Sequence, residues 1–225
     1  HRVLGKEVLA AGKPVELDVK LPTDRRHWVT AATADASLFG RSNPFGPSMN
    51  GLQLYWGEIH AQSGLCDGTN SPAYLYDYAR HAAGLDFASV TSHDFELTPG
   101  DWEEITAATK AAHVPGEFVT FLGYEWSGAG DRGGDHNIYF LDDDGPLIYN
   151  GSYRAYPAWD PAAGHATGAI DIRETIAQLD GHTCMVIPHG GGRTCNLDFF
   201  DAAAMPLLEV HSCHRSYDHI AKDAV

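Results

Sequence analysis

From residue 52 onward, short apolar runs of strand type alternate with segments that carry helix caps, and this alternation restricts the fold more than any other feature. The expected strands cover residues 52–59, 85–91, 118–123, 137–141, 183–187 and 206–210. Strands that are apolar along their length and separated by helices are typical of a parallel sheet covered on both faces. The pattern predicts an α/β protein with a parallel sheet, either open or closed into a barrel.

Three segments between these strands begin like helices. Ser71-Pro72 and Thr98-Pro99 each place a capping hydroxyl directly before a proline at the first helical position. Asp171 begins a sequence that resembles a capping box, with an apolar helical face after it. A helix is therefore expected after each of these caps.

The first part of the chain has a different pattern. Residues 13–21 alternate apolar and polar side chains, which indicates a half-buried strand, and residues 27–31 are a second strand candidate. Residues 40–49 are rich in Gly and Pro and predict a loop. We expect residues 1–50 to be a β-rich lead-in or the end of an N-terminal β domain, and residues 51–225 to carry the chemistry.

The composition limits the partners. In 225 residues, 15 Lys and Arg oppose 30 Asp and Glu, for a formal net charge of −15. This excess disfavours nucleic acid or an anionic membrane as the main partner, and no apolar run is long enough for a transmembrane helix. The 13 histidines are ligands for divalent metals, and bound ions would create a local cationic site for an anionic substrate. The compartment stays open, with the cytoplasm slightly favoured.

Metal-binding side chains gather at the ends of the expected strands. His60, His93, Glu125 and His189 each follow an apolar run, whereas His136 precedes its run and needs a loop that folds back. Carboxyl ends of parallel strands meet on one face, where active sites are built. Imidazoles and carboxylates there would hold Mn, Zn or Fe, and two such ions ~3.5–4 Å apart form a hydrolytic centre.

The order of these motifs resembles the PHP superfamily, named for polymerase and histidinol phosphatase. The stretch from Gly57 to Gly68 is similar to its first motif, and Thr91-Ser92-His93-Asp94 is similar to its second. Glu125, His136 and His189 follow in the family's order. The resemblance covers residues 52–214 and is closest to a long PHP-like subfamily.

This resemblance implies a distorted seven-stranded (β/α) barrel that binds two or three divalent ions and hydrolyses phosphoesters with a metal-activated hydroxide. Carried over residue by residue, it implies the metal ligands His60, Asp67, His93, Glu125, His136 and His189. The expected substrate is a small anionic molecule, most simply a phosphoester.

Three departures from the family pattern matter. Gln62 stands where most members have a second His, and an amide is a poorer zinc ligand. Ser92 replaces the usual Asp, and the late Asp-x-His motif has no clear counterpart. We expect the barrel to be incomplete in this chain, with a second chain or a further segment completing it.

Further candidates follow the last expected strand. One of Glu209, His211 and His214 is expected to face the site as a proton donor, and His214 is assigned this catalytic role beside Glu125. Arg193, in a glycine-rich segment, is expected to grip an anionic substrate. The alternatives are an amidohydrolase-like enzyme acting on a non-phosphate substrate, or a metal-binding module without turnover.

Overall fold

The computed structural model describes residues 20–22, 25–48, 50–151, 168–193, 195–214 and 216. Its internal contacts divide the chain into two compact units, His1–Leu54 and Tyr55–Val225. Each unit is considered by itself. No helix among the described residues is both long and apolar enough to span a membrane.

In the first unit, β1 (Thr30–Ala32) pairs with β2 (Phe39–Arg41) in an antiparallel hairpin. The strand expected over residues 27–31 therefore begins later, and the loop expected over residues 40–49 starts inside β2. Most of the strand expected over residues 13–21 lies outside the described residues.

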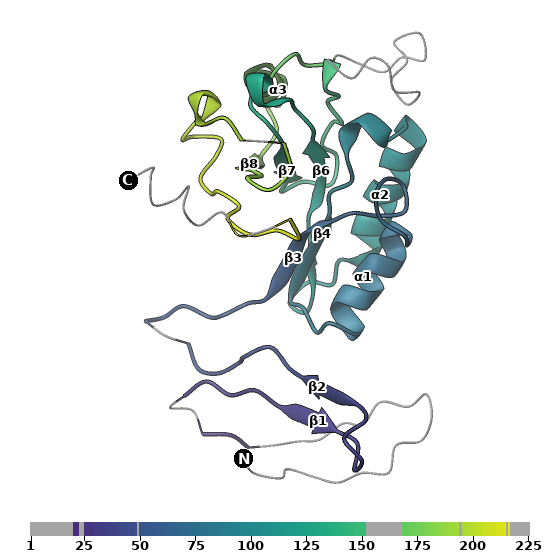
Figure 1. Cartoon of the computed structure of the whole chain (residues 1–225), viewed down its shortest axis with the longest axis vertical. Helices are drawn as coiled ribbons and strands as arrows, with labels where there is room; N and C mark the ends of the chain where they lie inside the picture. Colours follow the sequence, from purple (N-terminus) through teal and green to yellow (C-terminus); the bar gives the residue numbers. More distant parts are fainter. Residues whose placement is uncertain are drawn as a thin grey trace. The chain divides into compact units, whose positions relative to one another are not determined.

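The second unit contains two three-stranded sheets (Figure 1). The first sheet is parallel and consists of β3 (Gly57–Ala61), β4 (Phe87–Val90) and β5 (Val119–Thr120). The second sheet is antiparallel and consists of β6 (Leu122–Trp126), β7 (His136–Phe140) and β8 (Cys184–Pro188). A parallel bridge between His93 and Glu125 joins β6 to the end of β4. The class is α/β as expected, and the described residues show no closed barrel.

The prediction of a parallel sheet was wrong for β7, which runs opposite to both of its neighbours. The cause is the short connection before it. Only residues 127–135 separate β6 from β7, and a parallel crossover needs a dozen residues or more. The chain therefore turns back on itself and pairs antiparallel.

Other strand boundaries also moved. β3 starts at Gly57 rather than at residue 52, and the run expected over residues 118–123 breaks at Phe121 between β5 and β6. The strand expected over residues 206–210 was wrong as a strand: only Glu209 pairs there, through a single bridge to His189. A one-residue bridge still places the Glu209 side chain next to the end of β8.

The three capped helices were predicted correctly. They are α1 (Pro72–His81), α2 (Pro99–Ala112) and α3 (Ile172–Gln178). Ser71 and Asp171 each accept a backbone N–H in the first turn, and Thr98 forms a capping box with Asp101. Short 3-10 helices lie at Asp94–Glu96, Gly130–Arg132 and Leu197–Phe199. In Figure 1, α1 and α2 lie side by side next to the parallel sheet, while α3 lies near β7.

Two apolar clusters hold this unit together. The larger one contains side chains from β6, β7 and β8, including the fully buried Trp126 and Ile138, with Ile105 of α2 and Ile172 of α3. The smaller one packs Tyr76 of α1 against β4. Burying such large side chains stabilises the fold by ~1.5–3 kcal/mol each, so both sheets provide a rigid support for the residues at their ends.

Candidate metal centre

A register shift in β3 directs His60 into the candidate centre. The pairing of β3 with β4 is irregular between Glu58 and Ala61. The N–H of His60 donates instead to the Glu58 carboxylate, at 2.7 Å. Bulges of this kind bend a strand and re-aim a side chain, and they are frequent next to active sites. Glu58 therefore stabilises the local backbone that carries His60.

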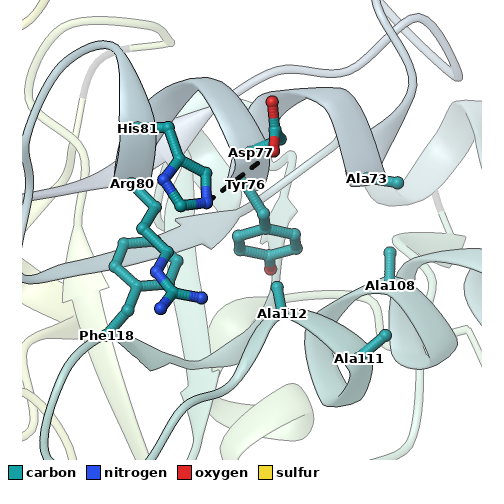
Figure 2. A pocket seen from close by; sticks show the side chains of 9 residues that line it. All are labelled: Ala73, Tyr76, Asp77, Arg80, His81, Ala108, Ala111, Ala112 and Phe118. Carbon is teal, nitrogen blue, oxygen red and sulfur yellow. Dashed lines mark ion pairs between the residues drawn. The ribbon is translucent and has the colours of Figure 1, made fainter. Parts of the chain in front are cut away.

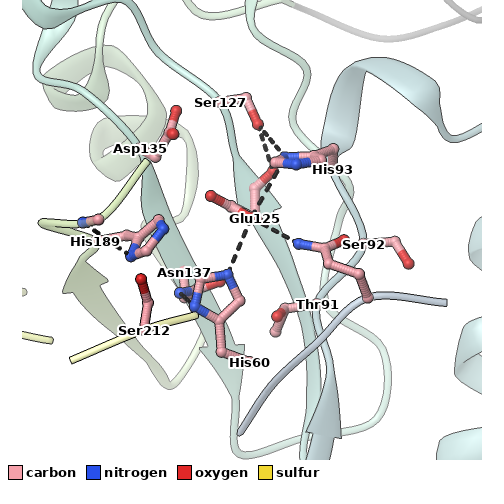
Figure 3. A network of polar contacts seen from close by, with 12 residues as sticks. His60, Thr91, Ser92, His93, Glu125, Ser127, Asp135, Asn137, His189 and Ser212 are labelled. Carbon is pink, nitrogen blue, oxygen red and sulfur yellow. Dashed lines mark hydrogen bonds and ion pairs between the residues drawn. The ribbon is translucent and has the colours of Figure 1, made fainter. Parts of the chain in front are cut away.

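Three residues from three strands bring potential metal-binding atoms together (Figure 3). These are His60 of β3, Glu125 of β6 and His189 at the end of β8, whose ligand atoms all lie within 4.8 Å of one another. Glu125 and His189 are buried, and His60 is partly buried. The Nε2 of His60 donates to Oε2 of Glu125 at 3.0 Å. Two imidazoles and a carboxylate are a common donor set for Zn, Mn and Fe.

His93 and Asp67 flank the same carboxylate. The Nδ1 of His93 lies 3.3 Å from Oε2 of Glu125 and 2.7 Å from Oγ of Ser127. On its other side, Nε2 of His93 lies 3.4 Å from Asp67, an exposed carboxylate. Glu125 therefore lies between His60 and His93, as Figure 3 shows. A carboxylate in this position can bridge two ions.

Glu209 is a further acidic residue at the centre. Its Oε2 accepts the Nδ1 proton of His60 at 2.9 Å and lies 3.3 Å from Nδ1 of His189. The side-chain amide of Asn137 donates to the same oxygen at 3.2 Å. Of the three candidates after the last expected strand, Glu209 is the one that contacts the cluster.

His214 and His211 lie farther out. His214 is exposed, and its ring centroid is 6.1 Å from that of His189. Its backbone N–H donates to Oγ of Ser212 at 3.1 Å. His211 is also exposed and pairs through a backbone bridge with Ser216. The catalytic role of His214 stays a prediction.

The glycine-rich segment after β8 packs directly on His189. A Cβ on Gly191 would lie 2.6 Å from the His189 ring, and one on Gly192 would lie 3.0 Å from it. The next residue, Arg193, donates to the buried carboxylate of Asp135 through its backbone N–H at 2.7 Å and its guanidinium at 3.0 Å. Arg193 is therefore held at the rim of the centre.

The two neighbouring residues His136 and Asn137 face opposite sides of β7, because side chains alternate along a strand. Asn137 pairs with Glu125 in the sheet register and contacts His60. His136 pairs with Trp126, packs its ring against the indole and places Nδ1 3.0 Å from the Gly134 carbonyl. No loop has to fold back, since the antiparallel direction of β7 already brings its first residues to this edge. The assignment of His136 as a ligand stays a prediction.

Gln62 and Ser92, which depart from the PHP pattern, both make hydrogen bonds beside the centre. Gln62 donates its amide N–H to Oε2 of Glu125 at 2.7 Å, so its nitrogen, not its oxygen, faces the cluster. Its oxygen accepts from the thiol of Cys66 at 2.8 Å. Ser92 shares a buried hydroxyl contact of 2.9 Å with Ser63. Both residues support the centre from its sides.

Burial and charge pull the pKa values of the centre in opposite directions. Burial favours neutral His60, but hydrogen bonds to Glu125 and Glu209 outweigh it and raise its pKa to about 10. Burial also opposes the charge on Glu209, yet hydrogen bonds from His189 and His60 lower its pKa to about 2. The pKa of Glu125 is lowered by His60 and His93 despite burial. His136 differs, because burial lowers its pKa to about 4.

Two hollows of this unit lie away from the centre. One cavity of about 260 Å³ lies between α1 and α2, next to Tyr76, Arg80 and Phe118 (Figure 2). A second of about 260 Å³ lies between α1 and the parallel sheet and is mostly apolar. Neither contains a residue of the His60, Glu125 and His189 cluster, so the case for a site rests on that cluster.

The sequence alone left Glu209 as one of three open candidates, and it did not identify Asn137 or Asp135 as residues of the centre. Glu209 was a candidate because of its place at the last expected apolar run, and its contacts with His60 and His189 distinguish it from His211 and His214. Asn137 and Asp135 are selected only once β7 is known to be antiparallel, because strand alternation then places them opposite to His136.

The fold and the cluster define an α/β protein with a candidate metal centre. Residues 69–194 match the family model described as a protein of unknown function, DUF3604. This match spans more than half of the chain, and the protein belongs to the DUF3604 family. No curated protein matches it significantly.

Three solved structures are distantly similar. A candidate metal-dependent phosphoesterase from Bifidobacterium adolescentis has a TM-score of 0.49 and 17% identity over 75% of this chain and 83% of its own. A two-domain protein from Bacteroides vulgatus that contains a predicted PHP-like metal-dependent phosphoesterase has a TM-score of 0.40 and 13% identity, over 79% of this chain and 44% of its own. An amidohydrolase from Chromobacterium violaceum, with bound sulfate and no metal, has a TM-score of 0.45 and 17% identity, over 75% of this chain and 81% of its own. These likenesses are too distant to transfer a function.

Proposed function

We propose that residues 51–225 form a metal-dependent hydrolase domain of PHP type, with phosphoesters as its substrates. The observation that carries this proposal is the buried convergence of His60, Glu125 and His189 from three separate strands. Buried imidazoles and carboxylates are costly to bring together unless something compensates for the burial, and a divalent ion would do so.

The donor atoms fit such an ion. Zinc binds nitrogen and oxygen at ~2.0–2.2 Å, which puts tetrahedral ligands ~3.4 Å apart. The His60–Glu125 contact of 3.0 Å is already near this value, and all three donors lie within 4.8 Å of one another. Small side-chain rotations would complete the geometry. Mn²⁺ and Fe²⁺ accept the same donors.

Asp67 and His93 would hold a second ion beside the first, with Glu125 shared between the two. His93 lies within 3.4 Å of both carboxylates, which supports this arrangement. When bound, the ions would lower the pKa of a coordinated water and polarise the ester. A third ion, and a role of His136 as its ligand, belong to the same proposal.

The protein's own side chains would then orient the substrate. Arg193 would bind an anionic group of the substrate, because its guanidinium is fixed by Asp135, whose backbone carbonyl accepts the N–H of His189. His214, 6.1 Å from His189 between ring centroids, would donate a proton to the leaving group. The negative net charge of the chain does not oppose this, since the local field decides.

The strands would belong to a distorted seven-stranded barrel. The two sheets support this, because they are joined edge to edge through the His93–Glu125 bridge and continue to Glu209 through its bridge with His189. The contact between His60 and Glu209 then connects the first strand of this series to its last segment.

The test combines elemental analysis with a screen of chromogenic phosphomonoesters and phosphodiesters in Mn²⁺. We expect at least one tightly bound ion per chain and turnover of one ester class. Glu125→Gln should abolish both, and Glu117→Gln, an exposed carboxylate paired with Arg80, should change neither. Protein without any bound ion after loading with Mn²⁺ or Zn²⁺ would rule out the centre.

One observation favours a second candidate, a metal-binding protein without turnover. Gln62 turns its amide nitrogen to Glu125 and so occupies space near the carboxylate without offering a ligand atom. Bound metal together with no hydrolysis of any phosphoester in the screen would support this second function.

A further inference from the structure

The contacts of Glu209 suggest a role beyond the three clustered residues. Its Oε2 lies 2.9 Å from Nδ1 of His60 and 3.3 Å from Nδ1 of His189. The rings of His60 and His189 meet edge to face at 4.5 Å between centroids. One carboxylate oxygen therefore faces the same nitrogen of two imidazoles that belong to the candidate centre.

We propose that Glu209 is the positioning residue of this centre, and that its carboxylate accepts the Nδ1 protons of His60 and His189. This rests on the proposed metal-dependent function. With Nδ1 committed to Glu209, Nε2 of each ring is left for the ion. Carboxylates that hold the remote nitrogen of a metal-binding imidazole fix its tautomer and orientation and increase its basicity.

The contacts of His60 define its geometry. Glu125 and Glu209 approach opposite ring nitrogens, at 3.0 Å and 2.9 Å. Ionised carboxylates only accept hydrogen bonds, so both nitrogens of His60 carry protons when no ion is bound. The amide nitrogen of Asn137 also lies 3.1 Å from Nδ1 of His60 and competes as a donor, but the hydrogen bond to the charged carboxylate is the stronger one. An ion at the cluster would replace the Nε2 proton that faces Glu125. The Nδ1 proton would stay on Glu209.

His189 has one competing contact. The N–H of Gly191 also lies 3.3 Å from Nδ1 of His189 and would prefer that nitrogen to be an acceptor. A charge-assisted hydrogen bond to a carboxylate is about twice as strong as a neutral one. The Glu209 carboxylate therefore determines the tautomer of His189.

Asn137 holds Glu209 in this position. It is fully buried, and its amide donates to Oε2 of Glu209 at 3.2 Å. With the two imidazoles and this amide, Oε2 of Glu209 has three close donors, and direct binding of an ion by that oxygen would sacrifice them. This favours Glu209 as a residue that orients the ligands and does not touch the ion.

The first experiment titrates the metal-free full chain with Co²⁺, whose visible spectrum reports the number and kind of ligands. Glu209→Ala is expected to weaken Co²⁺ binding by ~10–100-fold with unchanged stoichiometry and spectrum. Glu209→Gln keeps an uncharged acceptor and should recover part of that loss. Glu117→Gln, at an exposed carboxylate that pairs with Arg80, is the matched control and should behave like the wild type.

The outcomes separate the alternatives. A lower stoichiometry or an altered spectrum in Glu209→Gln would make Glu209 a direct ligand and overturn the inference. Unchanged affinity in Glu209→Ala would overturn it as well. Both results leave the proposed function intact, because the wild type would still bind the ion.

A second readout needs no metal. The Nδ1 proton of His60 should appear as a slowly exchanging signal in ¹H–¹⁵N spectra of the metal-free wild type and disappear in Glu209→Ala. Its absence from the wild type would overturn the inference. If the wild type binds no Co²⁺ but this proton behaves as expected, the proposed function fails and the contact between Glu209 and His60 is upheld.

Discussion

The two sheets of the second unit supply the candidate centre in different ways. The parallel sheet contributes residues only from the carboxyl ends of its strands, with His60 on β3 and His93 just after β4. The antiparallel sheet contributes from both directions: Glu125 and His189 come from the ends of β6 and β8, whereas Asn137 comes from the start of β7.

This difference shows what the position of a side chain at the end of an apolar run indicates. Residues at the ends of parallel strands lie at one edge of a sheet, and an antiparallel strand reaches the same edge with its first residues. On such a strand, alternation decides which of two neighbouring residues faces the centre. Asn137 faces the centre and His136 faces Trp126 for this reason.

The largest expected effect is at the junction of the two sheets. Glu125→Gln removes the charge that His60, Gln62 and His93 surround, and it should weaken metal binding by more than the ~100-fold expected for a residue that only orients ligands. Calorimetric titration with Mn²⁺ measures this. A wild-type affinity in this variant would show that the two sheets do not share one centre.

The next effect concerns pH. His60 of the parallel sheet has its pKa raised from 6.5 to about 10 by Glu125 and Glu209. The stabilisation from this raised pKa is complete below pH 6.5 and is lost as the pH rises to about 10. The slope should not exceed ~1.4 kcal/mol per pH unit for one proton. Thermal unfolding of the metal-free protein from pH 6 to 10 measures it, with His60→Gln as the variant that should lack the slope.

A smaller effect is expected at the end of the antiparallel sheet. Gly191→Ala would place a methyl group 2.3 Å from Oγ of Ser212 and 2.6 Å from the His189 ring. Such overpacking costs ~1–3 kcal/mol, or ~2–4 °C in Tm for each kcal/mol in a chain of this size. Metal binding should weaken with it, because His189 must move.

The matched control for Gly191→Ala is Gly100→Ala. Its new methyl group would meet only Oγ1 of Thr98, at 3.8 Å, in the first turn of α2. Equal losses of Tm in both variants would mean that the packing around His189 is not tight.

The smallest effect tests the two faces of β7. His136→Gln should cost ~0.5–1.5 kcal/mol through its hydrogen bond to Gly134, and it should remove only the proposed third Mn²⁺ while the ions at His60 and His93 stay bound. Chemical denaturation and elemental analysis measure the two quantities. An unchanged stoichiometry in this variant would exclude His136 as a ligand and restrict its role to the packing against Trp126.

Much of the fold could be predicted because its signals are local. Ser71, Thr98 and Asp171 are caps whose side chains satisfy N–H groups a few residues away, and the apolar runs around β4 and β8 are buried as expected. The approach of His60, Glu125 and His189 followed from the ends of such runs.

The remaining features depend on contacts that are distant in the chain. The direction of β7 depends on the length of the turn before it, and Glu209 reaches His60 across 149 residues. The apolar and polar pattern of the sequence contains no information on such distant pairs. The similarity of residues 57–68 to the first PHP motif identified Gln62 and Asp67. Their partners, Glu125 and His93, are seen only in the three-dimensional structure.

The contact between His60 and Glu209 also has a consequence for the order of folding. It closes a loop more than twice as long as the one closed by His60 and Glu125, 149 residues against 65. Loop-closure entropy grows only logarithmically, by ~0.6 kcal/mol for each doubling, so the longer loop is scarcely more expensive at equilibrium. Contacts between distant residues nevertheless form slowly, because the chain between them must first be ordered. The hydrogen bond between His60 and Glu209 should therefore form late in folding, after the contact between His60 and Glu125. The unit would then be able to bind an ion only once it has folded.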